Sequence, residues 1–191
     1  TFTSGSTVSK SDITSTGTWY LWTKVTDKAG NRASSIKVSN AFTVGTYSIT
    51  ITPSTTSWTN GNVTGTISYA SVLSSNRKAG AGSTLSAAQS AATTTTPTSR
   101  TLSANGYFYA EATDSMGNKV TVSRQVTTID KVAPTVSLSP NGGTFAKPTS
   151  GNATIKTKLT ASDTGGSGLN LLQYAWSTSN TTEPTSWTTF T

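Results

Sequence analysis

Two stretches of the chain share one pattern of apolar and polar positions, and both predict a β-hairpin. Residues 17–31 and 105–118 each carry a run of aromatic and β-branched side chains that ends in an Asp-x-x-Gly-Asn turn. Aromatic and β-branched residues favour strands, while Asp and Gly in this order favour a tight turn. We expect the second strand of each hairpin at residues 34–42 and 121–129.

The two hairpins lie at a fixed spacing along the chain. Asp27 and Asp114 are 87 residues apart, and the same spacing separates Pro53 from Pro140 without a gap. A period of this length indicates a tandem array of small domains, because solenoid repeats are much shorter.

This period divides the chain into one complete unit and two incomplete units. Residues 1–44 are expected to be the C-terminal half of a unit, and residues 45–131 a complete unit. Residues 132–191 are expected to be the N-terminal half of another unit. Residues 77–100 depart from the repeated pattern, and their Ala-rich part at 83–92 predicts a short helix.

Alternation along the repeated strand assigns its side chains to two faces. Leu21 and Phe108 fall on one face and are predicted to be core. Lys24 and Glu111 mark the other face as solvent-exposed. Trp176, on an expected third strand at residues 171–176, is also predicted to be core. The solvent face carries a predicted aromatic stripe, a candidate surface for a ligand or a neighbouring domain: Tyr20, Trp22, Tyr107 and Tyr109.

Composition indicates an all-β protein with a thin core. Only 32% of the residues are hydrophobic and 11% are charged, but five tryptophans and the regular alternation argue against disorder. A sandwich suits such a chain because each of its strands buries every second side chain.

Charge and residue types exclude several classes of function. The net charge of +7 comes from scattered basic residues, whereas nucleic-acid-binding proteins cluster theirs, so we expect no nucleic-acid partner. No apolar run reaches membrane-spanning length, so we expect no membrane insertion. The chain has no histidine or cysteine, and its seven acidic residues are dispersed. We therefore predict no catalytic residues, no thiolate metal site and no enzyme.

Four motifs carry a resemblance to a known family. They read Trp-Thr-Asn-Gly-Asn-Val-Thr, Ala-Thr-Asp-x-x-Gly-Asn, Asp-Lys-x-Ala-Pro-Thr-Val-Ser and Ala-Ser-Asp-Thr-Gly-Gly-Ser-Gly-Leu. In this order they resemble the bacterial Ig-like repeats of secreted, cell-surface and phage virion proteins. The resemblance covers residues 17–69 and 107–176. It implies tandem immunoglobulin-like β-sandwiches, with incomplete units at both ends, in an extracellular or cell-surface setting.

The resemblance also raises the question of calcium, because Ig-like arrays often stiffen their linkers with this ion. The candidate ligands are Asp130, Asp163 and Asp114. Calcium takes six to eight oxygen atoms and prefers several carboxylates, and one or two are few. The alternative that we favour is that these aspartates form turns, with no cofactor bound.

Together these features predict a structural module of a stalk, fibre or surface filament. The chain begins and ends in mid-pattern, so we expect it to be an excerpt of a longer polypeptide. We expect its incomplete end to be completed by the opposite end of an equivalent chain, so that its partners are neighbouring copies or adjacent repeats. The alternative is a carbohydrate-binding or adhesion module, which would bind cell-wall or host glycans through exposed aromatic side chains.

Overall fold

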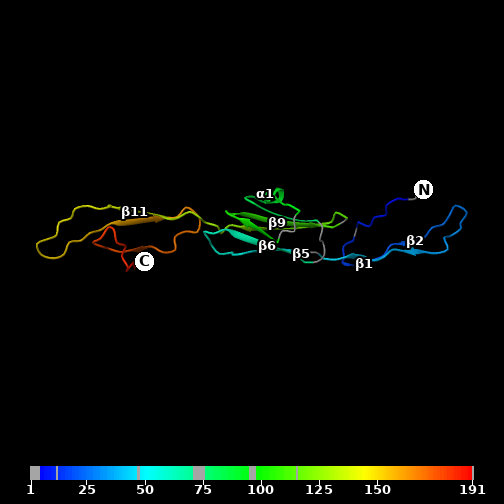
Figure 1. Cartoon of the computed structure of the whole chain (residues 1–191), viewed down its shortest axis with the longest axis horizontal. Coiled ribbons are helices and arrows are strands. Elements are labelled where there is room, and N and C mark those ends of the chain that lie inside the picture. Colours follow the sequence, from blue (N-terminus) through cyan, green and yellow to red (C-terminus); the bar gives the residue numbers. More distant parts are fainter. Residues whose placement is uncertain are drawn as a thin grey trace. The chain divides into compact units, whose positions relative to one another are not determined.

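The computed structural model describes residues 5–11, 13–46, 48–70, 76–94, 98–114 and 116–190. The chain forms two compact units, Thr1–Ser48 and Ile49–Thr191, which are described separately. Strands make up nearly all of the regular structure in the described residues, with one short helix, so the predicted all-β class is confirmed (Figure 1).

The first unit contains the predicted hairpin, which we call the N-terminal hairpin (residues 17–44). Its two arms pair in two short antiparallel ladders, β1 with β4 and β2 with β3, and Thr26 bridges Arg32 at the turn. Leu21, predicted to be core, is instead 41% exposed, because no described strand of this unit covers its face. The strands are β1 (Gly17–Trp19), β2 (Trp22–Thr23), β3 (Lys37–Val38) and β4 (Phe42–Val44).

The second unit begins with what we call the central unit (residues 49–131), whose first strand starts one residue earlier, at Ser48, and which has two three-stranded sheets. One has the order β5-β6-β8 and the other β10-β9-β7. Their strands are β5 (Ser48–Pro53), β6 (Val63–Ala70), β7 (Arg77–Gly82), β8 (Ser99–Leu102), β9 (Gly106–Thr113) and β10 (Lys119–Val126).

Hydrogen bonding fixes the register of β5 and β6. The Ser54 N–H donates to the Thr64 carbonyl oxygen at 2.8 Å, so the end of β5 meets the start of β6. In the antiparallel pair that this defines, Ile51 lies opposite Ile67. Both side chains are buried and belong to the same core cluster.

Phe108 lies at the centre of the core between the two sheets. Its side chain is fully buried, and it packs against Gly65 of β6 so closely that a Cβ atom there would come within 2.9 Å of the ring. The prediction that Phe108 is core is confirmed. A two-layer arrangement of this kind is consistent with a β-sandwich. The same cluster contains Ile51, Val63, Ile67, Ala79, Leu102, Ala110, Val126 and Ile129.

The predicted helix is present as α1 (Leu85–Ser90). Its N-cap is Thr84, whose Oγ1 accepts the Ala87 N–H at 3.1 Å. α1 lies on the face of β7 and β9 that points away from β6 (Figure 1). Gly80 allows this contact, because a Cβ atom there would collide with the carbonyl oxygen of Ala88.

The helix overturns the prediction for two residues of β9. Tyr109 and Glu111 were expected to face solvent, but only 6% and 8% of their surfaces are exposed. The Tyr109 hydroxyl donates to Glu111 Oε2 at 2.6 Å, and Lys119 Nζ donates to the same oxygen at 2.7 Å. Alternation identified the correct face of the strand, but it did not show that α1 would cover that face.

This buried network shifts the pKa values of both groups. Burial, and then the hydrogen bond to Glu111, raise the pKa of Tyr109 to about 12. Burial alone would raise the pKa of Glu111, but hydrogen bonds from Lys119 and Tyr109 outweigh it, and the net shift is downward.

The rest of the second unit is the C-terminal segment (residues 132–190). It has two antiparallel pairs, β11 with β12 and β13 with β14. Trp176, predicted to be core, is 64% exposed, because no described strand covers the face to which it belongs. The strands are β11 (Thr135–Ser139), β12 (Lys158–Ser162), β13 (Gln173–Tyr174) and β14 (Thr188–Thr189).

The raised pKa of Tyr109 predicts a loss of stability at alkaline pH. A group whose folded-state pKa is above its unfolded value of about 10 stabilises the fold fully below that pH. We expect this contribution to disappear as the pH rises from about 10 toward the folded-state pKa. Urea unfolding at several pH values should show that Tyr109→Phe loses less stability across this interval than the wild type. Tyr20→Phe, at an exposed tyrosine, is the control and should behave as the wild type; an equal decline in Tyr109→Phe would contradict the prediction.

Candidate functional site

The C-terminal segment repeats the first strands of the central unit. β11 and β12 pair with Leu138 opposite Leu159, as β5 and β6 pair with Ile51 opposite Ile67. Leu138 follows Ile51 by 87 residues and Leu159 follows Ile67 by 92, so only the connection between the strands is longer. β11 and β12 therefore occupy the places of β5 and β6.

The repetition extends through β13 at a spacing of 95 residues. Tyr174 of β13 pairs with Thr188, as Ala79 of β7 bridges Thr93. At the same spacing, Ser179 Oγ accepts the Thr182 N–H at 3.0 Å, which matches the bond at the N-cap of α1. β13 thus occupies the place of β7, and residues 177–187 occupy the place of α1.

No helix forms at this second cap. Pro184 falls where α1 has Gln89. Proline has no N–H for the helical hydrogen bond, and its ring disfavours a helical conformation in the residue before it. The cap is therefore followed by an irregular segment that reaches β14.

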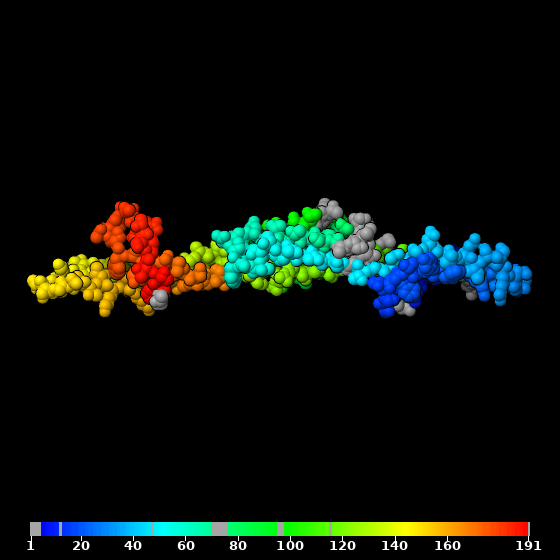
Figure 2. Space-filling model, turned by 90° about the horizontal axis from the view of Figure 1, so that it is seen from below, coloured from blue at the N-terminus to red at the C-terminus, as the bar shows by residue number. Residues whose placement is uncertain are grey.

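The strands of the C-terminal segment leave an open apolar face. In the central unit the matching face is covered by β9 and β10, but no described strand covers it in the C-terminal segment. Val136 is 63% exposed and Phe190 55%. A hollow of about 320 Å³ lies on this face, in the segment coloured yellow to red in Figure 2. It is lined by Ile155, Lys156, Thr157, Leu159, Tyr174, Trp176 and Phe190.

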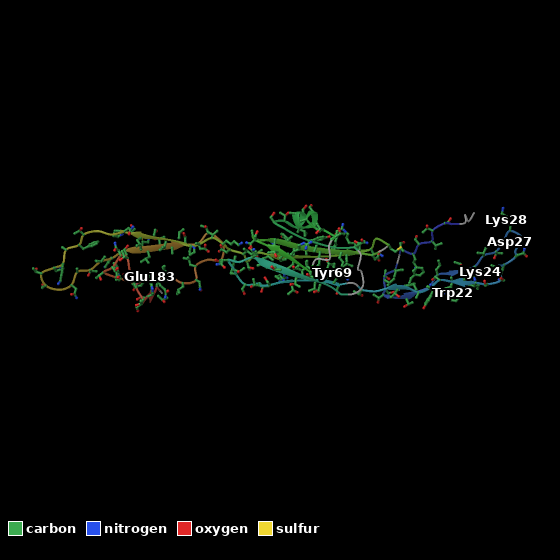
Figure 3. All side chains as sticks on the ribbon, in the orientation of Figure 1. Trp22, Lys24, Asp27, Lys28, Tyr69 and Glu183 are labelled. Atoms are coloured by element: carbon green, nitrogen blue, oxygen red, sulfur yellow. The ribbon has the colours of Figure 1, made fainter. Side chains whose placement is uncertain are left out.

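The N-terminal hairpin exposes apolar side chains on both faces. Tyr20 and Trp22 are 55% and 67% exposed, and Trp22 lies near Lys24 on the same arm (Figure 3). Val25 is 62% exposed on the opposite face, which also carries Leu21. The period places this hairpin where β9 and β10 lie in the central unit.

The predicted aromatic stripe exists only in the first copy. Tyr107 is half-buried and Tyr109 is buried in the central unit. The stripe therefore reduces to Tyr20 and Trp22.

The structure brings together two of the three aspartates considered for calcium. Asp130 Oδ2 accepts the Ser167 N–H at 2.9 Å, and Asp163 Oδ2 accepts the Ser167 hydroxyl at 3.3 Å. A Cβ atom at Gly165 would collide with the Asp130 carboxylate, so this loop needs glycine there. The glycine-rich loop was visible in the sequence, but its contact with Asp130, 37 residues away, was not.

Asp114 lies elsewhere, in the turn of the β9–β10 hairpin. Its carboxylate accepts the main-chain and side-chain N–H groups of Asn118 at 2.9 and 2.7 Å. Asp27 binds Asn31 in the same way. Hydrogen bonds from Asn118 lower the pKa of Asp114, and those from Asn31 lower that of Asp27.

These contacts match the turn-forming role. Each of the aspartates accepts main-chain N–H groups, which occupies oxygen atoms that a calcium ion would need. Among the residues that the structure describes, no group of three or more acidic, histidine or cysteine side chains could hold a metal ion.

Comparison of the chain with known protein families, with characterised proteins and with solved structures finds no match. The resemblance to bacterial Ig-like repeats therefore depends on the sequence motifs. Within the described ranges, no helix is long and apolar enough to span a membrane. The strongest functional feature of the described structure is the pair of open apolar surfaces.

The contact between Asp130 and the glycine-rich loop predicts a pH-dependent signal. Hydrogen bonds from Ser167 and Val132 hold the pKa of Asp130 below its usual value of 3.8. The stabilisation is therefore present above that value and is lost as the pH falls through the lowered pKa. The amide proton shift of Ser167, followed by NMR, should titrate with a midpoint below 3.8. Asp130→Asn should abolish the titration, and a midpoint above the usual value would show that the contact does not form.

Proposed function

We propose that this chain is a structural repeat module of an extracellular stalk, fibre or surface filament, built from Ig-like units. In such an array, the C-terminal segment is completed by a hairpin like residues 17–44. The observation that carries this proposal is the strand-by-strand match of β11, β12 and β13 to β5, β6 and β7. In the central unit, β9 and β10 extend the sheet of β7 and so cover the apolar face of β5 and β6.

The free energy of burying the open apolar face supports the completion of the C-terminal segment by a hairpin. Burying an exposed large apolar side chain contributes roughly 1.5–3 kcal/mol. Val136, Trp176 and Phe190 are each more than half exposed on the C-terminal segment. A contiguous apolar surface of this kind typically marks an interaction site, and a covering hairpin would bury all three side chains.

The strand edges support the same proposal. β11–β12 and β13–β14 are two-stranded pairs, and the described structure gives neither pair a third strand. An isolated pair of strands is marginal in water, and open edges invite pairing with another strand. In the central unit β9 pairs with β7, and a matching hairpin arm would pair with β13.

The second candidate function is a carbohydrate-binding or adhesion module. The exposure of Tyr20 and Trp22 favours it, because open aromatic side chains can stack on sugars. The two candidates differ in what covers this pair: an array covers them with a neighbouring unit, whereas a glycan-binding module leaves them open. The extracellular location belongs to both proposals and is supported by the family resemblance.

The structural role predicts that the purified chain self-associates. Sedimentation velocity at increasing concentration should show oligomers, and Trp176→Ser should weaken association by roughly tenfold or more, the effect of losing one buried large side chain. Trp187→Ser is the matched control, because Trp187 lies in the same segment but outside the hollow.

The glycan-binding alternative is tested with the same protein. A monomeric chain that binds saturably on a glycan array, with binding lost in Trp22→Ala, would favour the alternative. Association at the tested concentrations with no saturable glycan binding would favour the structural role.

A further inference from the structure

The β7–β9 ladder of the central unit provides a template for completing the C-terminal segment. Ala81 of β7 lies opposite Phe108 of β9. Lys78 lies opposite Glu111, and its Nζ is 3.7 Å from the carboxylate. Directly opposed residues of an antiparallel pair share one face of the sheet. Each position of this ladder has an equivalent in β13 and its continuation and in the N-terminal hairpin.

The two pairs of equivalent positions differ in which strand carries the larger side chain. At the 95-residue spacing Trp176 occupies the place of Ala81, and at the 87-residue spacing Leu21 occupies the place of Phe108. In the central unit the large aromatic ring therefore belongs to the hairpin, whereas in the proposed pair it belongs to the opposite strand. The smaller side chain of Leu21 leaves more room for the larger one of Trp176, so the two differ in size in the sense that cross-strand neighbours require.

The sheet that faces the hairpin also has a different residue at the position of Gly65. Phe108 fits because Gly65 has no side chain. Thr157 occupies the place of Gly65, since its hydroxyl donates to the Pro140 carbonyl oxygen at 2.7 Å, and Pro140 is equivalent to Pro53 at the end of β5. A side chain at residue 157 leaves less room for a phenyl ring, and Leu21 is the smaller residue that meets it.

Charged residues also differ on the outer face, the face of the sheet that α1 covers in the central unit. Lys24 stands where β9 has Glu111, and Glu183 stands where α1 has Ala88. In the central unit, Ala88 packs over Gly80 beside β9. The central unit thus has its acidic side chain on the hairpin. The C-terminal segment has it on the covering segment instead, and the N-terminal hairpin has a lysine at the equivalent position. This arrangement gives the two surfaces opposite charges on the same outer face.

We propose that the C-terminal segment binds the N-terminal hairpin of a second copy of this chain in the register of β7 and β9. This proposal rests on the proposed function and adds its register. Trp176 then lies opposite Leu21, Gln173 lies opposite Lys24, and Glu183 lies beside Lys24. Because the two surfaces are on different parts of the chain, the contact is head-to-tail and repeats without closing unless the copies form a ring.

Disulfide trapping tests the register, and the chain suits it because it has no cysteine. Opposed residues in an antiparallel pair have Cα atoms about 4.5–5.5 Å apart, within the range for a disulfide. A mixture of Lys24→Cys and Gln173→Cys chains should therefore give a covalent heterodimer on mild oxidation. Ser177→Cys is the control: it lies four positions along the strand and should not cross-link with Lys24→Cys.

The outcomes separate the register from the proposed function. If the chains associate but Lys24→Cys cross-links with Ser177→Cys instead, or with neither partner, the register is wrong and the structural role stands. If sedimentation velocity finds only monomers up to millimolar concentration, the second-copy proposal and the self-association on which it rests are both overturned.

A charge exchange tests the outer contact separately. Lys24→Glu and Glu183→Lys should each weaken association by roughly two- to fivefold at low salt, the effect expected for an exposed ion pair. The double variant, carrying both changes in one chain, should recover wild-type association. Lys28→Glu, in the turn of the same hairpin, is the charge-matched control. Additive weakening in the double variant would overturn the pairing of Lys24 with Glu183.

Discussion

The packing of Phe108 against Gly65 is the contact on which the central unit depends. The phenyl ring is fully buried because the glycine leaves room for it between the sheets. A buried phenylalanine contributes several kcal/mol to stability, which is a large share for a core made mostly of small and β-branched side chains. The contact also joins the β5–β6–β8 sheet to the β9–β10 hairpin, so the first sheet is covered only when that hairpin is present.

The same packing requirement explains why the apolar face of the C-terminal segment is exposed and which hairpin would cover it. Its strands follow the topology of the central unit, but its large side chains lie on β12, on β13 and beyond it rather than on a hairpin. A hairpin that carried Phe108 would meet Thr157 and Trp176 at crowded positions. The N-terminal hairpin has Leu21 in the place of Phe108, and the smaller side chain leaves more space at that position. Completion is therefore a matter of side-chain volume as much as of backbone pairing.

Local patterns predicted what local interactions determine. The Asp114 turn was identified from five residues, because the carboxylate binds Asn118 within the turn itself. Strand positions and the buried face of β9 followed from alternation. The burial of Tyr109 and Glu111 could not be predicted in this way, since it depends on α1 docking over Gly80. A helix was expected at that place in the sequence, but alternation does not show which sheet face a helix will cover.

The exposure of Trp176 and Leu21 has a different physical origin. Alternation placed both on core faces, and the structure leaves both open because the covering elements are not supplied by the strands around them. A pattern of side chains specifies which surface is to be buried, but not which segment buries it. In a repeat array that segment can belong to another unit, so these residues indicate where an interface is needed.

The outer face of the N-terminal hairpin links its two candidate functions. In the central unit, α1 covers Tyr109, and the equivalent Trp22 is open. The segment equivalent to α1 keeps the capping hydrogen bond at Ser179 but cannot continue as a helix because of Pro184. An irregular segment can cover a larger side chain than a helix docked on glycine, and tryptophan is larger than tyrosine. Trp22 would then be buried in an assembled array and open at a free end, so binding a sugar there and binding a neighbouring unit would compete for the same surface.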